Sequence, residues 1–226
     1  MYKFFYFITL LFLIFLIIFL LNKLREKTTN ELEKVLYIQN KPKLYLQLLK
    51  NGKLKIIYKR STLYQFKLNA YLLLGDDFQI ENITKSLDIM KMTKGESLEY
   101  NQKKLSYYCS QSNKEKAHAA FNKIENILSK AKGNKAKLIR KESKLIFDIY
   151  INHDTNLIKE LERIQVNQQG IIRGLTLYRL AKLSYFDQNN KKAQAYLVQA
   201  KELLRNTVWF DIVESALKNM SILNYK

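Results

Sequence analysis

The sequence predicts an all-α protein: an N-terminal transmembrane helix, followed by an α-solenoid of about four helical hairpins and a C-terminal capping helix. Three observations support this prediction: an apolar run near the N-terminus, apolar residues at three- and four-residue intervals beyond it, and features that recur at a nearly constant period. A hydrophobic content of 47% with one Pro and six Gly excludes disordered, collagen-like and low-complexity classes. The predicted parts are a transmembrane anchor at 1–22, a largely helical basic neck at 23–59 and a repeat domain at 60–226.

The apolar run covers residues 4–21, with the sequence FFYFITLLFLIFLIIFLL. At about 1.5 Å per residue, a helix of this length spans about 27 Å, close to the hydrocarbon thickness of a bilayer. The alternative is a cleavable signal peptide. However, the run exceeds the usual apolar region of about 7–15 residues, and no small-residue cleavage site follows it. We therefore expect a single-pass protein of the cell membrane.

Charges on either side of the run favour a cytoplasmic C-terminal domain. Lys3 is the one basic residue before the run, whereas Lys23, Arg25, Lys27 and Lys34 follow it. Basic residues near a span tend to stay on the cytoplasmic side. The orientation remains open, because large domains can be exported largely regardless of their charge.

The neck is strongly basic, with eleven basic and three acidic residues between Lys23 and Arg60. Anionic headgroups attract such segments by about 1 kcal/mol per basic residue near the surface, so the neck is a candidate for contact with an anionic membrane surface. The candidate lipid-contact residues are Lys23, Arg25, Lys27, Lys41 and Lys43. The alternative is compositional, since Lys greatly outnumbers Arg throughout the chain. Pro42 predicts a helix break at 40–42, because Pro disfavours helix at the residue before it.

Two periodic features indicate stacked hairpins in the remainder. Glycines 95, 133 and 170 are 38 and 37 residues apart and lie beside polar clusters, where helices turn. Sets of small or apolar residues spaced by four and then three residues begin at 83, 117, 157 and 193, with separations of 34, 40 and 36. These sets predict hairpins at about 60–92, 96–130, 136–166 and 171–204, and a final amphipathic helix from Thr207 to about Leu223. The alternative is an ordinary helical bundle with chance spacing.

The last hairpin resembles a tetratricopeptide repeat. Ala181 occupies the small-residue position of the family's first helix, and Ala193, Leu197 and Ala200 occupy the small, bulky and small positions of the second. The resemblance is best over 174–203 and weaker over 98–130, while the other two hairpins match mainly in length. Ser184 departs from the family pattern, which usually has an aromatic residue there.

The resemblance implies a scaffold or adaptor whose array binds another protein along the surface formed by the first helices. It places Tyr178, Lys182 and Tyr185 on that surface in the best repeat, and Gln102, Ser106 and Cys109 in the weaker one. The alternative is that these residues serve ordinary packing or are simply exposed to solvent. A net charge of +19 favours an acidic partner. The alternative function is a structural spacer whose basic surface binds anionic lipid or a cell-envelope polymer.

The sequence carries no recognised catalytic, cofactor or metal-binding motif, so we expect no enzyme, no cofactor and no metal. Cys109 and His118 are the one thiol–imidazole pair close in sequence, and no orienting third group accompanies them. Asp76, Asp77 and Asp154 are expected to be helix N-cap or turn residues, because a carboxylate accepts backbone N–H bonds there. The net positive charge predicts weak nonspecific attraction to nucleic acid, without sequence-specific binding.

Overall fold

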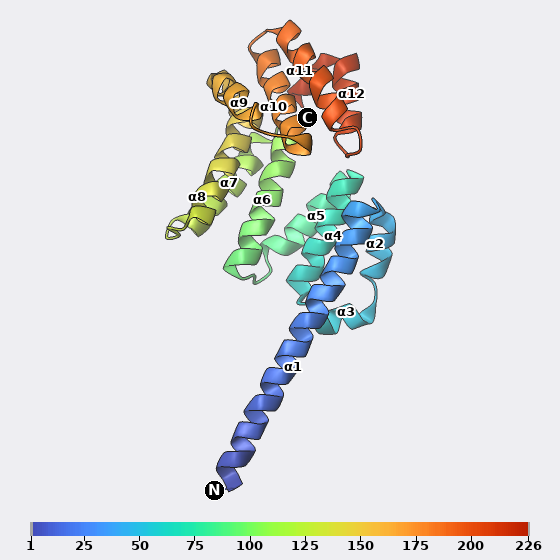
Figure 1. The fold of residues 1–226 in the computed structure, drawn as a ribbon, viewed down its shortest axis with the longest axis vertical. Helices are drawn as coiled ribbons and strands as arrows, with labels where there is room; N and C mark the ends of the chain where they lie inside the picture. Colours follow the sequence, from blue (N-terminus) through green and yellow to red (C-terminus); the bar gives the residue numbers. More distant parts are fainter. Residues whose placement is uncertain (1, 226) are drawn as a thin grey trace. The chain divides into compact units, whose positions relative to one another are not determined.

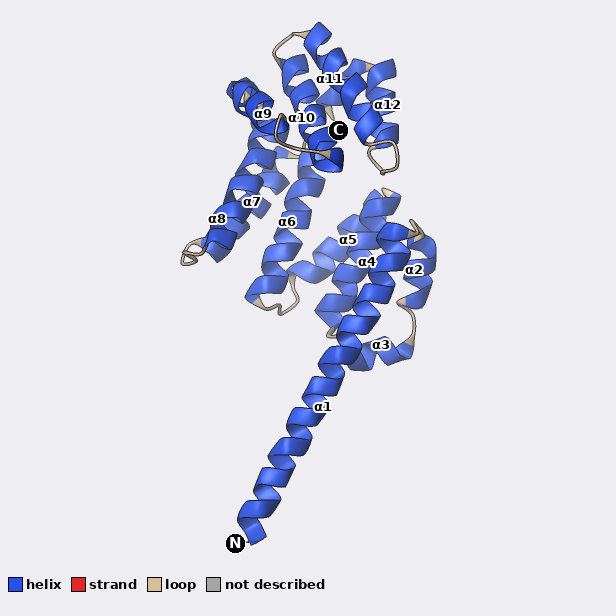
Figure 2. Ribbon diagram, in the orientation of Figure 1, coloured by secondary structure: helices blue, strands red, loops and turns tan. Residues whose placement is uncertain are grey.

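The computed structural model describes the backbone of residues 2–225 and the side-chain surroundings of residues 11–225. Throughout that range the regular elements are helices, and no strand occurs (Figures 1 and 2). The chain divides into two compact units, Met1–Met92 and Thr93–Lys226. The all-α prediction is therefore confirmed.

The first unit begins with a long helix and ends with a helical hairpin. Its helices are α1 (Tyr2–Glu33), the π-helix η1 (Lys34–Ile38), α2 (Pro42–Leu48), α3 (Gly52–Ile57), α4 (Arg60–Leu74) and α5 (Asp77–Asp88). The C-terminal part of α1 packs with α2, α3 and α4 around a core of Leu32, Leu36, Tyr45, Leu49, Leu54 and Ala70. The predicted break is confirmed: Asn40 is left-handed (φ 49°) and Pro42 starts α2.

The predicted transmembrane helix is corrected. In the described part of the chain, no helix is both long and apolar enough to cross a membrane. The apolar part of α1 with described side chains runs from Leu11 to Leu21, and Lys23, Arg25 and Glu26 continue the same helix toward Glu33. Side chains 4–10 of the predicted span lie outside the described residues.

The second unit consists of consecutive helices that pack on one another. They are α6 (Lys94–Ser110), α7 (Lys114–Leu128), α8 (Asn134–Phe147), the π-helix η2 (Asp148–Asn152), the 3₁₀-helix η3 (Thr155–Leu157), α9 (Ile158–Gln165), α10 (Gly170–Phe186), α11 (Asn190–Leu203), α12 (Phe210–Lys218) and the 3₁₀-helix η4 (Met220–Asn224). Closely packed pairs are α6–α7 and α10–α11. Helix α8 packs mainly on α7 and α6, and α9 mainly on α10.

The first helices of successive hairpins are also neighbours. Helix α6 contacts α8 and η2, and η2 in turn contacts α10. These helices therefore form one layer within the second unit, which we call the first-helix layer (α6, α8–η2 and α10).

Small residues allow the hairpins to pack closely. Ala181, Ala193, Leu197 and Ala200 are all fully buried where α10 meets α11. A Cβ atom added to Gly174 would lie 2.8 Å from Leu204 Cγ, so the backbone of α10 approaches this side chain as only glycine permits. The set that starts at Ala117 behaves similarly in α7, where Ala117 and Ile124 are fully buried.

A common turn joins the two helices of each hairpin. The first helix ends at a residue with positive φ, which is Gly75, Ser112, His153 or Gln188. An Asp or Asn follows and caps the next helix: Asp76, Asn113, Asp154 and Asn189 accept bonds from backbone N–H groups two or three residues on, at 3.1 Å each. The four caps are 37, 41 and 35 residues apart. The predicted cap or turn role is confirmed for Asp76 and Asp154, whereas Asp77 is the first residue of α5.

The final helix is shorter than predicted. The helix expected from Thr207 to Leu223 is interrupted at Asn219, whose backbone is extended (φ −146°). The Asn219 side chain accepts a 3.0 Å bond from the Ser221 N–H and starts η4. Asparagine competes for backbone groups in this way, and the competition ends α12 at Lys218.

Candidate functional site

The residues predicted to face a partner on α10 are covered by the end of the chain. Tyr178 and Lys182 are each 1% exposed, and Tyr185 is half-buried. The Lys182 ammonium donates a hydrogen bond to the Leu223 carbonyl in η4. The Asn224 amide lies 3.4 Å from the Tyr185 hydroxyl. This helix face therefore meets η4.

Aromatic rings surround the Lys182 ammonium. Its Nζ atom lies 5.0 Å from the centre of the Tyr150 ring and 5.5 Å from that of Phe186, distances at which a cation is attracted by a ring. The His153 ring stacks on Phe186 with centroids 3.7 Å apart. Burial lowers the pKa of Lys182 to about 8, with Cys109 acting in the opposite direction. The side chain is therefore mostly protonated at neutral pH.

Helix α6 supplies the other predicted residues of the first-helix layer. Gln102 is half-buried, Ser106 is exposed and Cys109 is buried. Burial raises the pKa of the Cys109 thiol to about 12, with Lys182 acting in the opposite direction. At neutral pH this residue is a thiol, which is a much weaker nucleophile than a thiolate. His118 is exposed, and its Nδ1 atom lies 3.1 Å from the Asn122 amide nitrogen.

Two hydroxyl groups on α10 are buried without a hydrogen-bond partner among the described residues. They belong to Tyr178 and Ser184. Burial, and then the nearby Tyr150, raise the pKa of Tyr178. A buried polar group without a partner costs about 1–3 kcal/mol. Tyr178 lies one helical turn before Lys182, so the face that contains Lys182 also holds one unused hydroxyl.

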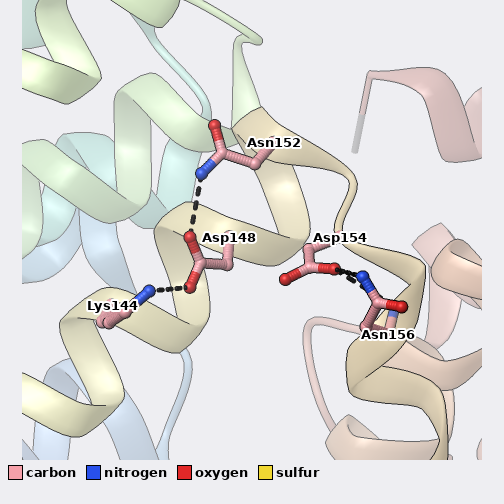
Figure 3. Close-up of polar contacts among 5 residues, drawn as sticks. All are labelled: Lys144, Asp148, Asn152, Asp154 and Asn156. Carbon is pink, nitrogen blue, oxygen red and sulfur yellow. Dashed lines mark hydrogen bonds and ion pairs between the residues drawn. The ribbon is translucent and has the colours of Figure 1, made fainter.

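The π-helix η2 contributes Tyr150 to this cluster, and His153 follows directly after it. Polar contacts fix the shape of this segment (Figure 3). The Asp148 carboxylate accepts bonds from Lys144 at 2.6 Å and from Asn152 at 2.8 Å. One turn further on, Asp154 N–H donates to the Asp148 carbonyl at 3.0 Å. These contacts close the hairpin turn beside the site. Among the described residues, no group of three or more His, Cys, Asp or Glu could hold a metal ion.

The predicted lipid-contact residues lie in the first unit. Lys23, Lys27, Lys41 and Lys43 are exposed. Arg25 has a structural contact, because its Nε atom donates a 2.7 Å bond to the Ile57 carbonyl at the end of α3. A cavity of about 320 Å³ lies nearby among α1, η1, α2 and α3, with mainly Leu and Val side chains in its wall.

Sequence reasoning missed the residues that complete the site. The sequence assigns no role to Tyr150, His153 or Asn224. It places Leu223 at the end of the final helix. One available signal was the Asp or Asn that follows each first helix, because its spacing marks every hairpin turn. No local signal pairs Lys182 with Leu223, which is 41 residues away.

Comparison of the chain with protein-family models, with curated proteins and with solved structures finds no match.

Proposed function

We propose that the chain is a non-enzymatic scaffold whose tetratricopeptide-like hairpins bind another protein. The observation that supports this most is the common hairpin turn, a left-handed residue followed by an Asp or Asn cap, which recurs at 76, 113, 154 and 189. A fixed turn at a period of 35–41 residues is typical of helical repeats, in which each hairpin buries its apolar face against the next.

The first-helix layer is the proposed binding surface. In a helical array, side-by-side first helices form an extended surface suited to a partner segment. Ser106 on α6 is exposed and Tyr185 on α10 is half-buried, so parts of the layer are accessible. The net charge of +19 favours an acidic partner, because opposite charge accelerates encounter and disfavours basic competitors.

The side chains of the layer support binding more than catalysis. Cys109, the strongest nucleophile type in the cluster, is held as a thiol by burial. The Lys182 ammonium is engaged with a backbone carbonyl and two aromatic rings. Both groups therefore lie within the packing between helices in this structure.

Site-specific photocrosslinking in living cells tests the proposal. A photoreactive amino acid at position 106 lies on the first-helix layer, and the matched control at position 123 lies at an exposed site of the second helix α7. We expect a discrete protein adduct from position 106 that is absent from position 123. Equal adducts from both positions, or adducts with lipid or polysaccharide alone, would contradict a protein-binding scaffold.

A further inference from the structure

Helix α3 lies beside α1 where the apolar side chains of α1 give way to charged ones (Figure 1). Three hydrogen bonds hold it there. Arg25 Nε donates to the Ile57 carbonyl at 2.7 Å, and the Tyr58 hydroxyl donates to the Arg25 carbonyl at 2.8 Å. The Thr29 and Tyr58 hydroxyl oxygens are 2.8 Å apart. The N-terminal part of α1 leaves the other helices of the first unit here, so α3 flanks the base of that part.

The face of α3 that points away from the core combines one apolar and two basic side chains. Leu54 and Ile57 are buried, whereas Ile56 is 82% exposed. Lys53 and Lys55 are exposed as well. At about 100° per residue, Ile56 lies roughly opposite the buried pair, with one lysine on each side of it. A large apolar side chain is therefore presented to the surroundings between two positive charges.

Next to α3, the surface of α1 is apolar in every direction. From Leu11 to Leu20 every side chain is that of a Leu, Ile or Phe, and each is 40–69% exposed. Soluble proteins rarely leave a continuous apolar surface of this kind uncovered. Further along the same helix, Lys23 and Lys27 are exposed. An apolar surface and a basic surface therefore meet at the position of α3.

We propose that this part of the first unit docks on an anionic lipid bilayer. Lys53 and Lys55 of α3 and Lys23 and Lys27 of α1 contact the headgroup phosphates, Ile56 enters the interface, and the apolar side chains of α1 contact acyl chains. Docking requires contact with one surface of the bilayer and no helix that crosses it. The inference goes beyond the proposed scaffold, because the proposed protein-binding layer belongs to the second unit.

A lipid surface fits these groups better than another macromolecule does. Residues 51–60 carry four basic side chains and no acidic one, so the exposed face of α3 attracts anions. Nucleic acid or an acidic protein would match the lysines but would leave Ile56 and the apolar part of α1 in water. A bilayer of anionic lipid offers phosphates and acyl chains side by side, and protein segments that bind its surface combine basic with large apolar side chains. Lipid is therefore the occupant that provides a partner for both kinds of exposed side chain.

Binding of the full chain to vesicles tests the inference, with a matched control elsewhere in the chain. The test variant carries Lys53→Gln, Lys55→Gln and Ile56→Ser. The control variant carries Lys135→Gln, Lys137→Gln and Leu138→Ser. In the control segment of α8, two exposed lysines precede a 69% exposed leucine at the same spacing, so the two variants lose the same charge and a similar apolar side chain.

We expect the test variant to lose about tenfold or more in affinity for vesicles of phosphatidylcholine mixed with phosphatidylglycerol, because each lysine near an anionic surface contributes about fivefold. The control variant should bind these vesicles like the unaltered chain. Equal losses in the two variants would indicate a general attraction between a basic chain and anions, and would overturn the inference. An unchanged affinity of the test variant would overturn it as well.

A fluorophore measures the contact at α3 independently of the overall affinity. An environment-sensitive label on Ile56→Cys, in a Cys109→Ala background, should shift its emission to the blue when the mixed vesicles are added, and the same label on Leu138→Cys should not. No shift at position 56, or equal shifts at both positions, would overturn the inference.

Duplex DNA serves as a second anionic probe. If the test variant loses as much affinity for duplex DNA as for the vesicles, the surface is a general site for polyanions and the inference is overturned. Crosslinking at position 106 concerns the second unit, so the lipid inference and the scaffold proposal can each fail without the other.

Discussion

The buried ammonium of Lys182 should make the stability of the chain depend on pH in an unusual direction. In the folded chain, burial lowers the pKa of Lys182 from the ordinary value of 10.5 to about 8. Between these two values the unfolded chain holds a proton that the folded chain has released. Stability therefore rises with pH across that window, and the cost of burying the charge is present below pH 8. A difference of about 2.5 pKa units corresponds to about 3 kcal/mol, at about 1.36 kcal/mol per unit.

Urea unfolding of the unaltered chain and of Lys182→Met, followed by circular dichroism from pH 7 to pH 10.5, measures this contribution. The free energy of unfolding of the unaltered chain should gain up to about 3 kcal/mol relative to Lys182→Met. The titratable groups that face Lys182 are neutral through most of this pH window and so do not contribute to the change in stability. Burial raises the pKa of Cys109 to about 12, raises that of Tyr150 and lowers that of His153. As a control, Lys123→Met on an exposed site should leave the pH dependence unchanged. A difference that stays flat or falls as pH rises would refute the burial of Lys182.

Three further predictions concern packing, capping and reactivity. In the same urea assay, Gly174→Ala should destabilise the chain by about 1–3 kcal/mol, because the new Cβ would lie 2.8 Å from Leu204 Cγ. Gly95→Ala is the control: its new Cβ would have nothing within 4 Å, and the substitution should stabilise α6 by about 0.5–1 kcal/mol. Asn189→Ala should cost about 1 kcal/mol through loss of the N-cap of α11, and no measurable change would contradict the cap. Cys109 should react with a thiol reagent at neutral pH only after unfolding, because it is buried with its pKa raised to about 12; rapid labelling of the native chain would show the opposite.

The helices and their ends were largely predictable because their signals are local. Asp76 and Asp154 were expected as N-cap or turn residues, and both accept the backbone bonds that define a cap. The break before Pro42 followed from the backbone restriction that proline imposes. The continuous helix expected to Leu223 was wrong, because the Asn219 side chain competes locally for a backbone N–H. The spacing of apolar residues gives no indication of that competition, so it did not predict the end of the helix.

The site was predictable only in part. The resemblance to a tetratricopeptide repeat implied that Tyr178, Lys182 and Tyr185 lie on the first-helix surface, and Lys182 and Tyr185 contact η4. What covers the face depends on contacts between residues about forty positions apart, for which a single sequence holds no local signal. The π-helix η2, in which Tyr150 contacts Lys182, could not be predicted either. A π-helical turn contains one residue more than an α-helical turn, and this difference leaves no signal in the amino-acid composition.

The position of the C-terminal segment (residues 219–225) on α10 is the central claim, and paramagnetic relaxation measures it most directly. A nitroxide label on Tyr225→Cys, in a Cys109→Ala background, should broaden the amide signals of Tyr185 and Ser112, because Asn224 contacts both residues. The same label on Lys123→Cys in α7 serves as the matched control. Broadening of the two signals by the label at 225, and not by the label at 123, is the predicted result. Sharp Tyr185 and Ser112 signals with the label at 225 would contradict a segment that fills the first-helix layer.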